Sequence, residues 1–164
     1  MDLLTIDLFN YNPNYFYYLD TQANILMNGY FTKMIYTHPH YTMNGLYFYF
    51  QVQYTYIEPC KDKYYVHFDP KILQNKVIME IIFKLETKIL NQYQEYSKTE
   101  KCALLTMHKH LSKGKFRIPH ACNTTSLNPC KYMFKISGIW ESEEEFGITY
   151  KWSEIQDHPS RIHS

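Results

Sequence analysis

The sequence predicts one α+β domain, built on a curved antiparallel sheet or a small OB-like β-barrel, with a long and a short helix inserted before a C-terminal β-hairpin. Three observations favour this class. Strand-rich segments come first and last, without the strand–helix alternation of a doubly wound sheet. Residues 131–152 alternate between apolar and polar positions on both arms of a hairpin. The chain has 164 residues and is 45% hydrophobic, which suits one core and excludes a disordered chain.

The first half of the chain has the alternation of β-strands. It predicts strands over residues 1–9, 15–19, 29–36, 46–57 and 64–68. The Asn44-Gly45 pair is a turn signal, but residues 37–43 are too many for a tight two-residue turn, so we expect a loop-joined hairpin there. The longest predicted strand has an apolar parity for the core and a second parity that places Tyr47 and Tyr49 on a wet face.

The middle of the chain has helical signals. Asp69 as N-cap and Pro70 at the first helical position predict a long helix that runs to about Tyr96. A second, shorter helix is predicted over residues 100–113, with Gly114 just after its end. The two helices therefore interrupt the strands and lie directly before the last part of the sheet.

The last third returns to strands. The pattern predicts a strand over 115–118, a loop over 119–130, the hairpin over 131–152 and a polar tail over 153–164, with residues 1–152 as one domain. In the hairpin, Ile136, Trp140 and Ile148 are assigned to the core. Gly138 and Gly147 are assigned a structural role, because glycine allows a strand to bend or bulge.

The charges are uneven although the net charge is only +1. Residues 98–135 hold seven lysines and one arginine against a single acid, whereas the hairpin turn holds Glu141, Glu143, Glu144 and Glu145. The N-terminus carries two aspartates and no basic region, which excludes a secretory signal, and no apolar run reaches the length of a membrane span. We therefore expect an intracellular protein with reduced thiols and no membrane partner.

Catalytic and metal motifs are not evident. A zinc site would have to come from Cys102, His108, His110, His120, Cys122 and Cys130, whose spacing matches no standard finger, so we predict no metal and no cofactor. The glutamates of the hairpin turn are interpreted as a solvated tip rather than a magnesium site. No nucleophile elbow, Gly-rich phosphate loop or zinc-protease motif occurs, so an enzyme is not predicted.

Binding of single-stranded DNA or RNA is the preferred function. Such proteins combine a positive surface with aromatic rings on which bases stack. The residues predicted to stack bases are Tyr47 and Tyr49, and those predicted to contact phosphates are Lys113, Lys115, Arg117, Lys131, Lys135 and Lys151. The alternative is a protein-interaction role, possible also as a homo-oligomer, because the chain has 17 tyrosines and tyrosine is enriched in interface cores.

A resemblance adds to this interpretation. The runs NGLYFYF (44–50), LTMHKHLSKGKFRI (105–118) and KISGIWESEEEFGITYK (135–151) resemble segments of small uncharacterised proteins of large nucleocytoplasmic DNA viruses. The resemblance spans about residues 30 to 152 and implies a viral origin, with an OB-like, single-strand-binding role in host cytoplasm, nucleus or virion. A virion-associated or host-factor-binding protein is the corresponding alternative. The family supplies no catalytic residues.

Overall fold

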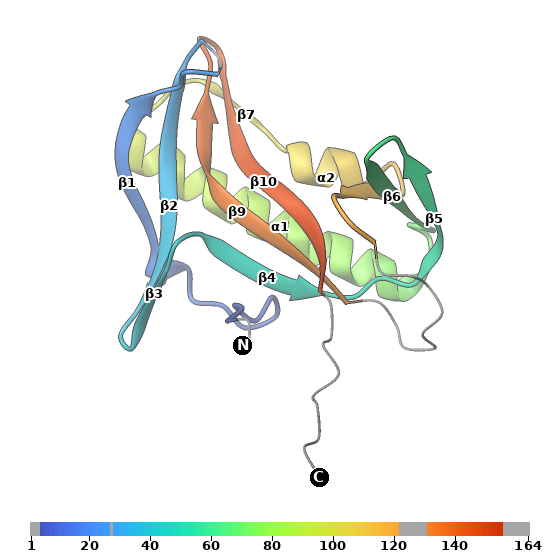
Figure 1. The fold of residues 1–164 in the computed structure, drawn as a ribbon. Helices are drawn as coiled ribbons and strands as arrows, with labels where there is room; N and C mark the ends of the chain where they lie inside the picture. Colours follow the sequence, from blue (N-terminus) through green and yellow to red (C-terminus); the bar gives the residue numbers. More distant parts are fainter. Residues whose placement is uncertain (1–3, 27, 122–130, 156–164) are drawn as a thin grey trace.

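The structure is a computed structural model that describes residues 4–26, 28–121 and 131–155. A large curved sheet has the long helix behind it and a small second sheet at one end (Figure 1). The elements are β1 (Phe16–Ala23), β2 (Tyr30–His38), β3 (Tyr41–Met43), β4 (Leu46–Phe50), β5 (Tyr54–Cys60), β6 (Lys63–Phe68), α1 (Leu73–Ser97), β7 (Cys102–Leu104), α2 (Thr106–Leu111), β8 (Lys115–Ile118), β9 (Lys131–Glu141) and β10 (Glu145–Ile155), with a 3-10 turn η1 (Pro13–Tyr15) before β1.

The predicted α+β class with a curved sheet is confirmed, and the barrel alternative is not. The seven-stranded sheet has the order β1-β2-β9-β10-β7, and within the described residues it stays open between β1 and β7. Pairing is antiparallel except for β7, which runs parallel to β10. No helix in the described part of the chain has the length and apolarity needed to cross a bilayer.

Strand β9 is the centre of the large sheet. One of its edges pairs with β10 along the whole strand. Its other edge is shared: β4 pairs with residues 132–136, and β2 pairs with residues 138–141. Beyond that point β2 leaves β9 and pairs with β3 instead. The large sheet therefore splits, and β4 continues the place that β2 vacates.

The core lies between the inner face of the large sheet, α1 and the small sheet β5-β6-β8. Phe50, Phe134 and Trp152 point inward from β4, β9 and β10 and are buried. Phe116 of β8 packs against them, with its ring 5.5 Å from that of Trp152 and 5.0 Å from that of Tyr132. These aromatic contacts join the two sheets into one hydrophobic core.

A β-bulge in β9 changes which residues face the core. The register shifts where Thr149 pairs with Gly138 and Tyr150 pairs with Ile136, which leaves Ser137 as the extra residue. After the bulge, Ile139 is buried and Trp140 turns to the outer face. The assignment of Trp140 to the core is therefore wrong, because simple alternation cannot anticipate an inserted residue.

The predicted strand 46–57 is in fact two strands in two sheets. Between the two strands, the backbone of Gln53 forms two hydrogen bonds with the buried side chain of Asn75. Gln53 N–H donates to Asn75 Oδ1 at 2.8 Å, and Asn75 Nδ2 donates to Gln53 O at 3.0 Å. Because those groups are satisfied by α1, they need no neighbouring strand. The chain can then leave β4 and start β5.

Both predicted helices are shorter than expected. The Asp69-Pro70 signal marks a turn, in which Asp69 Oδ1 accepts the N–H of Lys71 at 2.8 Å, and α1 starts at Leu73. Residues 102–104, predicted as helix, form β7 instead, because the open edge of β10 offers them hydrogen bonds.

Helix α2 is capped from α1. Its backbone N–H groups at Met107 and His108 each donate to the fully buried carboxylate of Glu86, both at 2.9 Å. Burial raises the pKa of Glu86 above its usual value, although those N–H donors act in the opposite direction. This contact fixes the start of α2 against the long helix.

Three further boundaries differ from the prediction. Residues 38–41 close a tight turn with a His38–Tyr41 pair, not a loop. Of the segment predicted as a strand over 1–9, the described residues 4–9 make a single bridge, from Ile6 to Phe48. Strand β10 continues to Ile155, three residues into the predicted tail. The rest of that tail and most of the loop 119–130 lie outside the described residues.

The two hairpin glycines give a matched test of the close packing. A Cβ at Gly138 would lie 2.3 Å from the backbone O of Thr32, whereas one at Gly147 would first meet the half-buried ring of Trp140 at 2.8 Å. Since a backbone moves less easily than a ring, we expect Gly138→Ala to lower the free energy of unfolding by about 1–3 kcal/mol and Gly147→Ala to cost less. Urea unfolding measures both, and equal costs would contradict this account.

Candidate functional site

Five of the eight predicted site residues gather on the outer face of the large sheet. Tyr47 pairs with Lys135, and Lys135 pairs with Lys151, so one ring and two ammonium groups form a row across β4, β9 and β10. Tyr49 lies in the next row, opposite Met133. Lys131, at the start of β9, has the same parity as Lys135. We call these five residues the outer-face cluster.

The backbone around Gly45 favours a contact between the side chains of Tyr47 and Lys135. Lys135 Nζ lies 5.2 Å from the centre of the Tyr47 ring, within the range of a cation–π contact. The side chain of Lys135 reaches this position by passing over Gly45, where a Cβ would lie 2.8 Å from Lys135 Cε. Gly45 also has φ +129, which other residues rarely adopt. The Asn44-Gly45 turn signal thus marks the position over which the Lys135 side chain packs.

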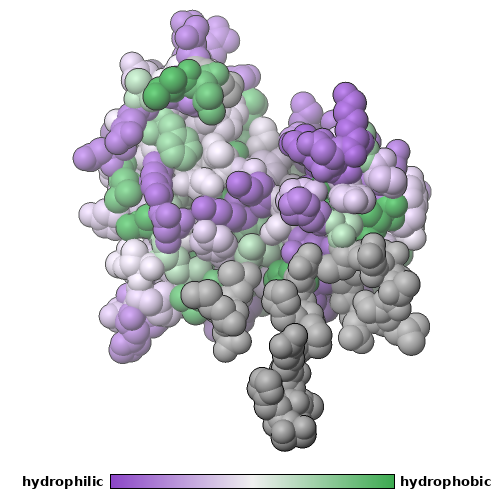
Figure 2. Space-filling model, in the orientation of Figure 1, coloured by the Kyte–Doolittle hydropathy of each residue, from purple (hydrophilic) through white to green (hydrophobic). Residues whose placement is uncertain are grey.

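The outer face around this cluster is basic. Lys33 of β2 has the same orientation, opposite Gly138, so the face carries lysines on three strands. The face also has acids: Asp20 of β1 lies in the register shift opposite Lys33, Asp7 lies beside β4, and Glu145 is at the far end of β10. Figure 2 views this face of the molecule, and hydrophilic atoms extend across the front of the sheet.

Lys115 and Arg117 lie on the outer face of the small sheet instead. Lys115 pairs with His67 and Arg117 with Tyr65, and Lys115 Nζ lies 5.1 Å from the centre of the Tyr65 ring. On the other side of His67, the ring of Tyr56 stacks on it at 4.2 Å and is 55% exposed. We call these five residues the small-sheet cluster; its main acid is Glu58, bonded to His67 at 2.6 Å.

The two clusters point away from each other. Lys115 and Arg117 alternate with Phe116 and Ile118, which are buried against the large sheet. Lys135 alternates with residues buried on the opposite side of that same core. Lys113 belongs to neither cluster, since it lies in the exposed turn between α2 and β8. The structure therefore does not bring the eight predicted residues to one surface.

The aromatic residues of the small-sheet cluster were missed by sequence reasoning. Tyr56 has the parity of the core side chains in the predicted strand 46–57, but a register shift after Tyr54 turns it outward. Tyr65 and His67 could have been found, because they alternate with the apolar residues Val66 and Phe68.

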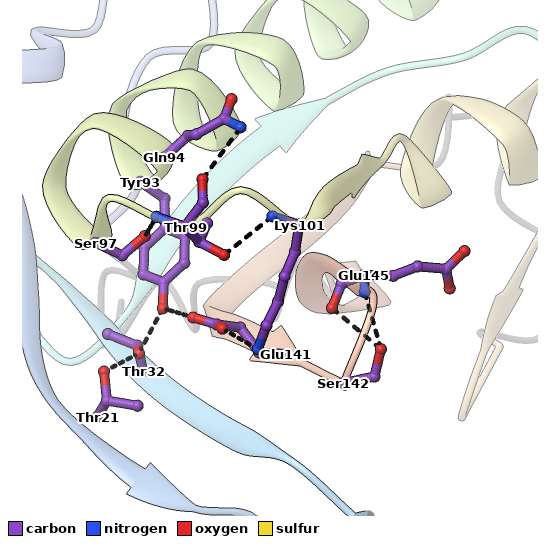
Figure 3. Close-up of polar contacts among 10 residues, drawn as sticks. All are labelled: Thr21, Thr32, Tyr93, Gln94, Ser97, Thr99, Lys101, Glu141, Ser142 and Glu145. Atoms are coloured by element: carbon purple, nitrogen blue, oxygen red, sulfur yellow. Dashed lines mark hydrogen bonds and ion pairs between the residues drawn. The ribbon is translucent and has the colours of Figure 1, made fainter.

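A partly buried polar cluster lies at the other end of the sheet (Figure 3). Tyr93 of α1 donates to Glu141 of β9, and Lys101 Nζ lies 2.7 Å from the second oxygen of Glu141. Thr32 Oγ1 lies 3.1 Å from the Tyr93 hydroxyl and 2.6 Å from Thr21 Oγ1. Burial and the carboxylate raise the pKa of Tyr93 to about 12. The carboxylate of Glu141 is thus paired with the Tyr93 hydroxyl and the Lys101 ammonium group, and the cluster joins α1, β2 and the hairpin.

The candidate metal ligands do not assemble in the described residues, where no three His, Cys, Asp or Glu side chains gather. His108 packs on Phe83 with ring centres 4.7 Å apart, and the His110 ring contacts the Tyr150 hydroxyl. Cys102 is exposed in β7, and His120 is exposed after β8. Cys122 and Cys130 lie outside the described residues.

An apolar groove opens beside Tyr49. It has a volume of about 470 Å³ and lies between the N-terminal segment, the end of β4 and the first turns of α1. Its lining residues are Phe9, Tyr49, Phe50, Gln51, Leu73, Gln74, Val77 and Ile78. Phe9 is 67% exposed and Leu73 75% exposed, so much of this apolar surface is in contact with water. Such a surface is typical of an interaction site.

Glu141 gives a pH test of the polar cluster. Burial alone would raise its pKa, but the hydrogen bonds and charge of Lys101 and the Tyr93 hydroxyl outweigh burial and hold it below the ordinary 4.5. Because the pKa of Glu141 is lower in the folded than in the unfolded state, its ionised carboxylate stabilises the fold at pH values above the unfolded pKa. That stabilisation is lost as the pH falls through the folded pKa. We expect Glu141→Gln to lower the free energy of unfolding by about 1–3 kcal/mol at neutral pH, and by clearly less below about pH 4.

Urea titrations that follow tryptophan fluorescence measure this difference. Glu143→Gln, at an exposed position of the same turn, is the control and should match the wild type. A Glu141→Gln cost that is unchanged or larger in acid would contradict the assigned pKa direction.

Comparison with known proteins gives no relative: no protein-family model, no curated protein and no solved structure matches this chain. The resemblance to proteins of large DNA viruses therefore stays a prediction.

Proposed function

We propose that this protein binds single-stranded nucleic acid, without catalysis and without strong sequence readout, on the outer face of the large sheet. The observation that carries the proposal is the row Tyr47–Lys135–Lys151. Neighbouring strands lie about 4.8 Å apart, so the ring and both ammonium groups fall within the reach of one or two nucleotides. A base stacks on a tyrosine, and the lysines contact the phosphates.

The outer-face cluster suits this role better than the small-sheet cluster because of its charge. The outer face carries Lys33, Lys131, Lys135 and Lys151 on β2, β9 and β10, and these lysines outnumber the acids Asp20 and Glu145 of the same sheet. On the small sheet, Glu58 lies among the basic residues, and Asp62 is in the adjoining turn. A phosphate chain is attracted by the excess of positive charge over a continuous surface, so the larger sheet offers the more favourable path.

The contact between Lys135 and Tyr47 supports the proposal in a second way. The two side chains are already in contact, and Lys135 packs over Gly45, so few side-chain rotamers are lost when a ligand binds. A preorganised surface loses less conformational entropy on binding. The contacts are to a base plane and to phosphates, which every nucleotide has, and sequence specificity is therefore not expected.

A protein-interaction role is the second candidate, with a viral or host protein as partner. The apolar groove favours it, because Phe9 and Leu73 leave apolar surface in water next to a hollow. This surface does not overlap the lysines of the outer-face cluster, so the two functions can be tested apart.

Charge-matched double variants test the nucleic-acid proposal. Lys135→Ala/Lys151→Ala and Lys115→Ala/Arg117→Ala each remove two positive charges, one pair from each cluster. We expect the first pair to weaken binding of a labelled single-stranded oligonucleotide and to reduce the salt slope by about 0.7 per lost phosphate contact. The second pair should have a small effect. Fluorescence anisotropy at low and moderate salt measures both.

The stacking part is tested by Tyr47→Leu, which keeps apolar bulk but removes the flat ring. It should weaken binding by roughly 5- to 150-fold, the range expected for one base stack, with an unchanged salt slope. No binding by the wild type at low salt would exclude the proposal. A loss confined to Lys115→Ala/Arg117→Ala would place the nucleic acid on the small sheet and contradict the site.

A further inference from the structure

Two apolar side chains protrude at the end of the β1–β2 hairpin. Ile25 is 99% exposed and Leu26 94% exposed, and we call this pair the apolar tip. The backbone around them is held by hydrogen bonds: Asn24 N–H donates to Gly29 O at 2.9 Å, and Leu26 N–H donates to Asn24 Oδ1 at 3.1 Å. Figure 2 shows strongly hydrophobic atoms at this end of the molecule. Apolar groups presented in this way indicate a contact surface.

We propose that the apolar tip of one copy of this chain occupies the apolar groove of a second copy. This inference does not rest on the nucleic-acid proposal. The tip is a knob of two aliphatic side chains, and the groove, of about 470 Å³, has the size of a pocket that encloses a group of this kind. One chain therefore carries both a protruding apolar surface and an open apolar hollow.

The two surfaces lie toward opposite ends of the molecule. In Figure 1 the β1–β2 hairpin end is at the top, and the groove lies lower, where β4 ends and α1 begins. A contact between two different surfaces of identical chains repeats from copy to copy when the copies follow one another head to tail, and it closes as a two-fold dimer when the copies run antiparallel and each tip enters the other copy's groove. The expected assemblies are therefore head-to-tail chains, rings or an antiparallel dimer.

The charges around the two surfaces are complementary. Glu143 and Glu144 are exposed on the turn beside the tip, where Gly29 packs against the backbone of Glu141. At the groove, the first turn of α1 has no acidic residue and no side-chain cap, so no side chain of that turn compensates the positive end of its dipole. Lys71 and Lys76 are exposed next to it. An acidic turn therefore meets a positive helix end when the tip enters the groove.

Two aspartates also lie near the groove, but both are engaged. Asp7 Oδ1 accepts the N–H of Phe9 at 2.9 Å, and Asp69 Oδ1 accepts that of Lys71 at 2.8 Å. They temper the positive charge of the groove without reversing the sign at the start of α1. We therefore expect association to be driven by apolar burial and oriented by charge, with a modest weakening at high salt.

Paired variants test the proposal. Ile25→Ser/Leu26→Ser removes the tip, and Leu73→Glu blocks the groove; both sites are exposed, and an acid in the first helical turn favours the helix, so folding is preserved. Sedimentation velocity over a concentration series should show wild-type association, weakened roughly ten- to a hundredfold in each variant. Tyr17→Ser, at an exposed position on neither surface, is the control and should associate like the wild type.

Mixing gives the decisive result. The tip variant keeps its groove and the groove variant keeps its tip, so an equimolar mixture should form a one-to-one heterodimer that does not grow further. A wild type that is monomeric up to its solubility limit would overturn the proposal, as would variants that associate unchanged or a mixture without heterodimer. A monomer that binds phosphatidylcholine vesicles through the tip would assign the tip to lipid and also overturn it.

Discussion

The sharing of one edge of β9 by two strands is the constraint on which the rest of the structure depends. β4 pairs with residues 132–136 and β2 pairs with residues 138–141, so β2 has to leave β9 where β4 begins. At this junction a side chain at Gly138 would collide with the backbone of Thr32, and Gly45 has a positive φ that other residues rarely adopt. The bulge at Ser137 lies at the same place, and it lets β9 present different faces to its two partners. The split of the sheet and the assignment of its side chains to core and outer face follow from this division.

The bulge links the fold to both ends of the molecule. Before it, β9 sends aromatic side chains into the core and Lys135 outward beside Tyr47. After it, the parity is exchanged, so that Glu141 reaches inward to Tyr93 and is fixed by Lys101. A strand of constant parity would have placed that carboxylate in water. One strand therefore supplies lysines to the outer-face cluster before the bulge and a carboxylate to the polar cluster after it.

The sequence was sufficient for features that depend on neighbouring residues and insufficient for those that depend on distant ones. The hairpin and the strand at 115–118 follow from periodicity, and both are present. The division of strand 46–57 depends on Asn75, and the conversion of residues 102–104 to strand depends on the free edge of β10. The sequence predicts one basic surface from the window 98–135. In the structure, Lys115 and Arg117 flank the buried Phe116 on one side of the core, and Lys135 follows the buried Phe134 on the opposite side.

Tyr49 connects the two proposed surfaces. It shares the outer face with Tyr47, and it also lines the apolar groove beside Phe50. A side chain that fills the groove therefore restricts a ring next to the row proposed to bind nucleic acid. By thermodynamic linkage, any effect of self-association on strand binding must be matched by an equal effect of strand binding on self-association. Single-strand binding is commonly cooperative along the strand, and under the two proposals Tyr49 is the residue through which neighbouring copies would be coupled to the strand.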